Sequence, residues 1–365
     1  MNKILIIMII LAAFLFPVKC YAEEDYGQDE IVDALPDTVQ DYLDEKDITP
    51  DNSGALSLTP KDVIEEIWGL ICNEAVKPLK MLCMLLGVIL LCAIVESMGG
   101  SFGNTSDTFR IVGVLACAGM MCTYISESVS YALETINGAG TFMLAFVPAF
   151  AGMVALNGQT STATVFGSIL IVATQVFSQL SVTFLMPLSS SVLGISVAGA
   201  VNPDLKINNL AASVKKVVVW GIGLLMTVFV GLLGIQGFIT TSADSVAMKA
   251  AKFAVSNSVP IVGGAVSDAL STVKGSITLV KSSMGTFGII AGASLILPAL
   301  ISVVCYKLAL TIAAAISEMF SVPSLTSLLR SGESVISIII AMLFCFMIMI
   351  IVSTALVLLV GSGAA

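Results

Sequence analysis

Residues 243–285 read ADSVAMKAAKFAVSNSVPIVGGAVSDALSTVKGSITLVKSSMG, and they lie between two long apolar segments. Polar residues recur in this stretch with helical spacing, before and after a Val-Pro pair, so that they share one face of each helix. The candidate site residues in this polar stripe are Lys249, Lys252, Ser267, Ser271, Lys274, Thr278 and Lys281. The spacing predicts two amphipathic helices inside a membrane domain. The second, over 261–284, would be about 36 Å long at about 1.5 Å per residue, which is enough to cross a bilayer.

Two interpretations of the polar stripe remain open. In the first, the helices lie flat in the headgroup layer, or pack with their lysine side chains extended towards water. In the second, the stripe over 261–284 faces a polar cavity or a pore shared between subunits. A lysine side chain inside a membrane has a high free energy unless it is hydrated or paired. A row of lysines is therefore typical of a water-filled pathway through the membrane.

The composition predicts a polytopic α-helical membrane protein. The chain has 365 residues, of which 57% are hydrophobic and 11% are charged, and it contains no histidine. A soluble domain this apolar would have too little polar surface. The formal charge of −9 is concentrated near the N-terminus, because residues 23–66 contain fifteen acids and two bases. An acidic segment followed by a membrane domain gives no indication of nucleic-acid binding.

The N-terminal third divides into four predicted parts. Residues 1–22 have the pattern of a cleaved signal peptide, with an uncleaved anchor as the alternative. Residues 23–60 form an acidic extracytoplasmic segment, either a solvated linker with short helices or a segment that orders on a partner. Residues 61–78 form an amphipathic helix along the membrane surface, with Trp68 at the interface. Residues 79–108 hold the first transmembrane helix and its loop.

The rest of the chain reads as two overlapping membrane repeat units, 109–240 and 217–365, which share the span 217–240. Val-Pro followed by glycine occurs at Pro148 and Gly152, and again at Pro260 and Gly264, with a constant offset of 112 residues. Repeated helix sets are common in transport proteins. Each Val-Pro element is expected to break or kink a helix within the membrane, where the freed backbone groups must face protein or water.

Loop charge predicts the orientation. With residue 23 outside the cell, the lysine-bearing loop 202–216 is cytoplasmic if three segments cross between 141 and 200. The number of crossings after residue 285 is open, and so is the side of the C-terminus. Lys307 is an intramembrane charge that either lies on a pathway or marks an interfacial turn between two shorter helices.

The sequence contains few features of catalytic or metal-binding sites. The eight cysteines form no Cys-x-x-Cys pair, and no nucleophile-elbow, zinc-protease or P-loop motif occurs. Asp244 and Asp268 are single acids, which are too few for an aspartyl intramembrane protease. We therefore expect no enzyme activity, no catalytic residue, no metal site and no cofactor.

The segment AMKAAKFAVSNSVPIVGGAVSDALSTVKGS, residues 247–276, resembles the stage III sporulation protein AE family of endospore-forming bacteria. The order of signal peptide, acidic segment and multi-span domain is similar as well. The resemblance implies a multi-pass protein of the mother-cell membrane around the forespore. It also implies partners, namely an ATPase and ring-forming extracytoplasmic proteins of a channel or feeding complex that supports forespore development.

Two functions follow as hypotheses. The first is a conduit or scaffold subunit, with a homo-oligomer in the bilayer as one form of it, in which the lysines of the polar stripe line a polar surface and the acidic segment contacts partners. The second is a self-contained, permease-like secondary transporter, with its site between the two units near Pro148 and Pro260.

Overall fold

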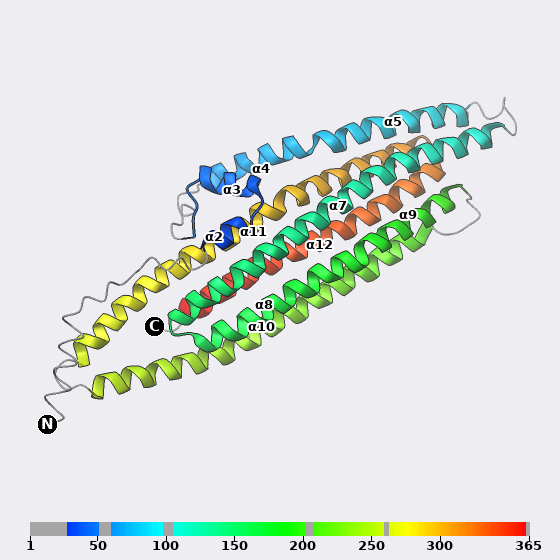
Figure 1. The fold of residues 1–365 in the computed structure, drawn as a ribbon. Helices are drawn as coiled ribbons and strands as arrows, with labels where there is room; N and C mark the ends of the chain where they lie inside the picture. The colour runs from blue at the N-terminus through cyan, green and yellow to red at the C-terminus, as the bar shows by residue number, and fades with distance from the viewer. Residues whose placement is uncertain (1–27, 51–59, 98–104, 202–207, 259–262, 363–365) are drawn as a thin grey trace, which may run out of the picture.

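The structure is a computed structural model that describes residues 28–50, 60–97, 105–201, 208–258 and 263–362. Every element in these ranges is a helix, and long helices run side by side in an elongated bundle (Figure 1). The all-α prediction is therefore confirmed. The predicted signal peptide, 1–22, and Pro260 lie outside the described residues.

Within the described residues, six helices are long and apolar enough to cross a membrane. They begin with α5 (Val76–Ser97) and α7 (Thr105–Leu156), followed by α8 (Thr160–Leu180), α10 (Asn208–Ser258), α11 (Gly263–Met319) and α12 (Pro323–Ser362). A shorter helix, α9 (Met186–Val201), follows α8. The multi-span prediction is therefore confirmed by length and composition, whereas the internal repeat stays a prediction.

Several helices are much longer than a bilayer is thick. The 52 residues of α7 extend about 78 Å, against a hydrocarbon layer of about 30 Å. This single helix contains the start of the first predicted repeat unit, at residue 109, and the first Val-Pro element. The break expected at Pro148 and Gly152 is absent, because α7 is continuous through both. An interior proline removes one backbone hydrogen bond, and the packing of buried Phe146 and Phe150 on either side offsets that loss.

The chain between 160 and 201 forms one rod. Residues 141–200 therefore consist of two segments, the end of α7 and this rod, and not the three on which the predicted orientation was conditional. Helix α8 passes into the π-helical turn η2 (Ser181–Leu185), which passes directly into α9 (Figure 1). Pro187 is the second residue of α9 and has no N–H to donate to the preceding turn. A single π turn at this place accommodates the missing bond without ending the rod.

The centre of the bundle is formed by α7, α11 and α12. Phe142, Phe146 and Phe150 of α7 are at most 2% exposed and stack in series, with ring centroids 5.4 and 5.2 Å apart. Glycines let α11 approach this stack. A Cβ added at Gly288 would lie 2.2 Å from the Phe146 ring, and one at Gly292 would lie 2.7 Å from Ile350 of α12. A Gly-x-x-x-Gly pair of this kind lets neighbouring helices pack closely.

The apolar parts of α5 and α12 are staggered along α7. Lys77, at the start of α5, pairs with Glu127, so α5 lies along the first half of α7. Gly332 of α12 lies against Met121 and Ile125 of α7, so the long apolar stretch that follows it lies along the second half. The apolar stretches of α5 and α12 are therefore displaced from each other along the long axis of the bundle.

Residues 28–50 of the acidic N-terminal segment are folded onto the bundle. Helix α2 (Gln28–Asp33) and helix α3 (Asp37–Glu45) bury one apolar face against it, while α4 (Pro60–Glu74) packs on α11. The buried residues of this face are Ile31, Leu35, Val39, Leu43 and Ile48. We call residues 28–48 the clasp. Helix α3 ends with Asp47 in the left-handed region at φ 53°, and Ile48 donates its N–H to the carbonyl of Leu43 at 2.9 Å. This Schellman-type end turns Ile48 back into the core.

Candidate functional site

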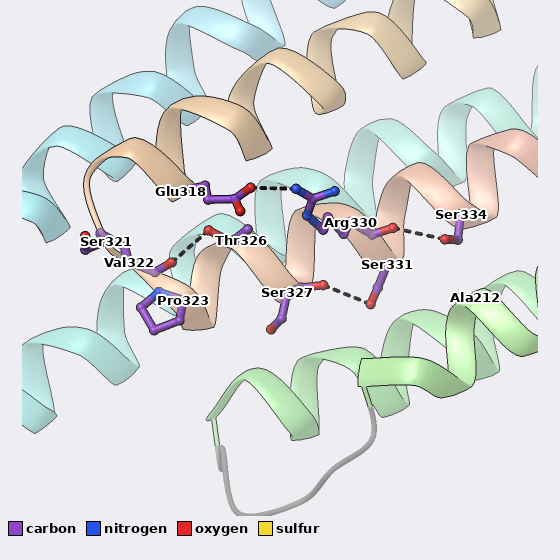
Figure 2. A pocket seen from close by; sticks show the side chains of 10 residues that line it. All are labelled: Ala212, Glu318, Ser321, Val322, Pro323, Thr326, Ser327, Arg330, Ser331 and Ser334. Carbon is purple, nitrogen blue, oxygen red and sulfur yellow. Dashed lines mark hydrogen bonds and ion pairs between the residues drawn. The ribbon is translucent and has the colours of Figure 1, made fainter.

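A polar pocket of about 580 Å³ lies at the turn between α11 and α12. Figure 2 shows the start of α10, at Ala212, beside the serine side chains of α12. The lining residues come from three helices and are mostly hydroxyl-bearing or charged: Ala212, Glu318, Ser321, Val322, Pro323, Thr326, Ser327, Arg330, Ser331 and Ser334.

The turn that forms the pocket has a defined geometry. Ser321 takes a left-handed φ of 59°, and Val322 donates its N–H to the carbonyl of Ser317 at 3.1 Å, which closes a Schellman-type end. The hydroxyl of Ser317 donates to the carbonyl of Val322, and Thr326 donates to the Ser317 hydroxyl at 3.0 Å. These bonds fix the angle at which Pro323 begins α12.

One ion pair crosses the pocket mouth. Arg330 Nη2 and Glu318 Oε2 are 2.5 Å apart, and both side chains are more than half exposed. An exposed pair of this kind contributes little stability. Its effect is to hold the guanidinium over the α11 end of the pocket (Figure 2).

The serines of the pocket can accept hydrogen bonds but are poorly placed to attack a substrate. Ser327, Ser331 and Ser334 each donate to a backbone carbonyl three or four residues earlier. Their oxygen lone pairs remain for a ligand or for water. The chain has no histidine, so the usual general base for a serine nucleophile is missing. The pocket can therefore bind polar groups.

A buried carboxylate joins α10 to the start of α8. Asp244 is 5% exposed and accepts hydrogen bonds from the backbone N–H of Ser161 and of Thr162, each at 3.0 Å. It also accepts the Thr162 hydroxyl at 2.7 Å. The first N–H groups of a helix have no partner within it, and the helix dipole favours an anion there. Asp244 therefore has a structural role at the α7–α8 turn.

A second cavity, of about 370 Å³, lies between the clasp and the bundle. Its walls come from α3, α4 and α11, and at its edge the hydroxyl of Tyr42 donates to Glu66 Oε2 at 2.9 Å. Burial, together with the hydrogen bond and the charge of Glu66, raises the pKa of Tyr42 to about 12. Tyr42 therefore remains a hydrogen-bond donor at physiological pH.

The predicted polar stripe is described only in part. Lys249 lies exposed on α10. Lys252 lies within α10, and Ser267, Ser271, Lys274, Thr278 and Lys281 lie within α11, but their side chains are outside the described part of the structure. The pore interpretation of the stripe thus stays a prediction. For the second Val-Pro element, α10 ends at Ser258 and α11 begins at Gly263, one residue before Gly264.

Lys307 is half-buried in the last quarter of α11. The helix is continuous from Gly263 to Met319, so the predicted interfacial turn at Lys307 is wrong. A proline nine residues earlier, Pro298, also lies inside α11 without ending it. The pathway interpretation of Lys307 stays a prediction.

The turn pocket and the cap made by Asp244 were not predicted from the sequence. Serine recurs on α12 at 324, 327, 331 and 334, which is helical spacing and was a usable signal for the pocket. Asp244 had no such signal, because its partners Ser161 and Thr162 are more than eighty residues away in the chain.

Comparison with known proteins places the chain beside one family. The sequence model of stage III sporulation protein AE matches residues 43–361. The stage III sporulation protein AE of Bacillus subtilis (strain 168) is 22% identical over 244 residues, which is 65% of this chain and 60% of that protein. The aligned part thus spans less than two thirds of the relative. No solved structure matches.

Proposed function

The chain belongs to the stage III sporulation protein AE family, and from this premise we propose that it is a membrane subunit of a channel or feeding complex between mother cell and forespore. In this proposal it lies in the mother-cell membrane around the forespore. Its partners are an ATPase and ring-forming extracytoplasmic proteins, and the complex supports forespore development. We propose no enzymatic activity and no cofactor for this subunit.

The observation that carries the proposal is the aromatic stack at the centre of the bundle. Phe142, Phe146 and Phe150 fill the space between α7 and α11 at the level of Pro148, and Gly288 brings α11 into direct contact with Phe146. A polar substrate crossing there would lose its hydration without gaining hydrogen bonds. A single chain is thus poorly suited to conduct by itself at this level, which favours a path formed between chains.

The same stack weighs against the alternative, a self-contained secondary transporter. That hypothesis needs a site between two repeat units near Pro148 and Pro260. Its support is the recurrence of Val-Pro and glycine with an offset of 112 residues. The bundle beside Pro148 is filled by phenylalanine rings instead, so we rank this function second.

Charge supports an orientation for the subunit. Lys215 and Lys216 lie near the start of α10, and Arg330 lies near the start of α12. Both helices begin at the end of the bundle where α9 and α11 end (Figure 1). By the positive-inside rule we assign that end to the cytoplasm. The clasp then lies outside the cytoplasm. Six crossings bring the C-terminus to the clasp side, and the serine-lined pocket faces the cytoplasm.

The staggered apolar stretches support an oblique crossing. A flat bilayer perpendicular to the bundle axis would cover the apolar part of α5 or that of α12, but not both. Long apolar helices commonly fit a thinner hydrocarbon layer by tilting. We therefore place the bundle at a marked angle to the membrane, which also accounts for apolar stretches as long as the 46 residues of Ile111–Leu156.

The extracytoplasmic end offers surfaces for partners. Helices α10 and α11 extend beyond the rest of the bundle there (Figure 1), and α10 carries the exposed Lys249. The clasp on the same side is acidic. Opposite charges on neighbouring surfaces suit selective contacts with ring-forming proteins.

The test is purification of the tagged protein from solubilised membranes of growing and of sporulating cells, followed by mass spectrometry. We expect a large assembly in sporulating cells alone, with an ATPase and ring-forming extracytoplasmic proteins. Recovery of a lone monomer or dimer from both kinds of cell would overturn the subunit proposal and favour the transporter.

A further inference from the structure

The cavity beneath the clasp has the form of a small binding site with an apolar interior. Most of its wall is contributed by aliphatic side chains, together with the ring of Pro298 on α11. The apolar lining residues are Val39, Ile67, Leu70, Ile289, Ile290, Ala293, Leu297 and Pro298. Its polar lining residues are Thr38, Tyr42, Glu66 and Ser294. A concave apolar space with a few polar groups is the usual form of a ligand site.

The cavity lies next to the membrane surface. Its wall includes Ile67 and Leu70 of α4, and the apolar span of α5 begins at Val76, directly after α4 ends at Glu74. The other face of α4 exposes Ile64 by 67% and Trp68 by 66%. An exposed tryptophan beside an exposed isoleucine is typical of a helix in contact with the headgroup layer. Membrane lipid is therefore the apolar molecule present at the highest concentration beside the cavity.

The charge at the cavity edge selects among lipids. Glu66 is the charged residue of the lining, and the clasp helix beside it exposes Asp37, Asp41 and Asp44. The lining includes no lysine or arginine. A phosphatidylglycerol headgroup, with a net negative charge, would be repelled, whereas an ammonium group would be attracted.

We propose that this cavity binds one acyl chain of an amine-bearing phospholipid, such as phosphatidylethanolamine, with the ammonium group against Glu66. The acyl chain lies between the clasp and α11 beside Ala293, and Tyr42 holds the Glu66 carboxylate at the edge. The lipid then forms part of the contact that keeps the acidic clasp on the bundle. This site requires a membrane protein and is independent of the channel proposal.

The test uses photoactivatable lipids and the full-length protein in nanodiscs. One probe is phosphatidylethanolamine with a diazirine on its acyl chain, and the other is phosphatidylglycerol with the same chain. We expect the ethanolamine probe to label peptides from α11 around Ala293 about fivefold more than the glycerol probe. A preference of this size corresponds to one partly exposed ion pair, here between the lipid ammonium group and Glu66. Equal labelling by the two probes, or labelling confined to other helices, would overturn the proposal.

Two variants test the two ends of the site. Ala293→Phe fills the cavity and should abolish labelling at α11, whereas Ala315→Phe, at an exposed alanine of the same helix, should leave it unchanged. Glu66→Gln should remove most of the preference between the two probes, because Glu66 is the acid of the lining. Asp41→Asn, at an exposed acid outside the lining, should weaken the preference only slightly.

Folding of each variant is checked by gel filtration and circular dichroism. If Ala293→Phe does not fold, Ala293→Leu provides a smaller filling, for which we expect partial loss of labelling. Full labelling in a folded Ala293 variant would contradict the chain site. A preference that persists in Glu66→Gln would contradict the role of Glu66.

Discussion

Asp244 on α10 and Thr162 on α8 are joined twice, because one carboxylate oxygen of Asp244 accepts both the backbone N–H of Thr162 at 3.0 Å and its hydroxyl at 2.7 Å. The other oxygen accepts the N–H of Ser161. A residue of α10 thus caps the N-terminus of α8. This contact fixes the α7–α8 turn, where Gly158 takes a left-handed φ of 82°.

We predict that Asp244→Ala lowers the free energy of unfolding by about 2–3 kcal/mol, because two N–H groups of α8 lose their acceptor in a buried place. The measurement is the thermal unfolding midpoint of the purified protein in detergent. Asp244→Asn keeps one acceptor oxygen and should lose less. An unchanged midpoint in Asp244→Ala would show that the cap is dispensable.

Gly288→Ala should destabilise the bundle by about 1–3 kcal/mol through overpacking, because the added Cβ would lie 2.2 Å from the Phe146 ring. The same thermal unfolding experiment measures it. A second substitution, Phe146→Leu, should restore part of the loss by making room. Gly119→Ala is the matched control, since no atom lies within 4 Å of its added Cβ, and it should be neutral or slightly stabilising.

The hydroxyl of Tyr42 should lose its proton at a higher pH than an ordinary tyrosine. Its pKa is raised to about 12, first by burial and then by the hydrogen bond and charge of Glu66. A raised pKa in the folded state means that the contact contributes fully below pH about 10, the unfolded value, and is lost as pH rises through about 12. The measurement is tyrosinate absorbance at 295 nm, taken as the difference between the wild type and Tyr42→Phe.

The same titration separates the causes. Glu66→Gln should lower the Tyr42 midpoint only in part, because burial is the larger cause of the raised pKa. A midpoint near the ordinary value for tyrosine in the wild type would mean that the clasp is open in solution.

The orientation predicts which thiols face outward. Cys72 of α4 is exposed and lies on the clasp side, so a membrane-impermeant maleimide should label it in intact growing cells that express the protein. Cys72→Ser is the control. Ser321→Cys at the α11–α12 turn, introduced in that background, should be labelled only after permeabilisation. The opposite pattern would invert the topology.

Local sequence patterns predicted the helices that face the membrane surface. The continuity of α7 and the cavity beneath the clasp depend on contacts between residues that are far apart in the sequence. The stretch around Trp68 and the start of α5 carry their own amphipathic and apolar signals, and the structure has α4 and α5 there. Pro148 predicted a break from a local rule, but the phenylalanines around it pack well enough to keep α7 continuous. The clasp cavity combines α3 with α11, whose lining residues are about 250 positions apart in the chain, so sequence spacing could not reveal it.

Reversing the charge of two lysines in the polar stripe, as Lys274→Glu with Lys281→Glu, should impair spore formation without preventing membrane insertion. If the stripe lines a pore shared between subunits, its lysines produce a positive electrostatic potential there, and the substitutions make that potential negative. The potential acts over about 10 Å in physiological salt. The measurement is the yield of heat-resistant spores, together with co-purification of the complex. Lys80→Glu is the matched control, because it reverses the charge of an exposed lysine on α5 outside the polar stripe, and it should leave spore formation unchanged. If the double variant sporulates and assembles normally, the lysines lie in the headgroup layer and line no path.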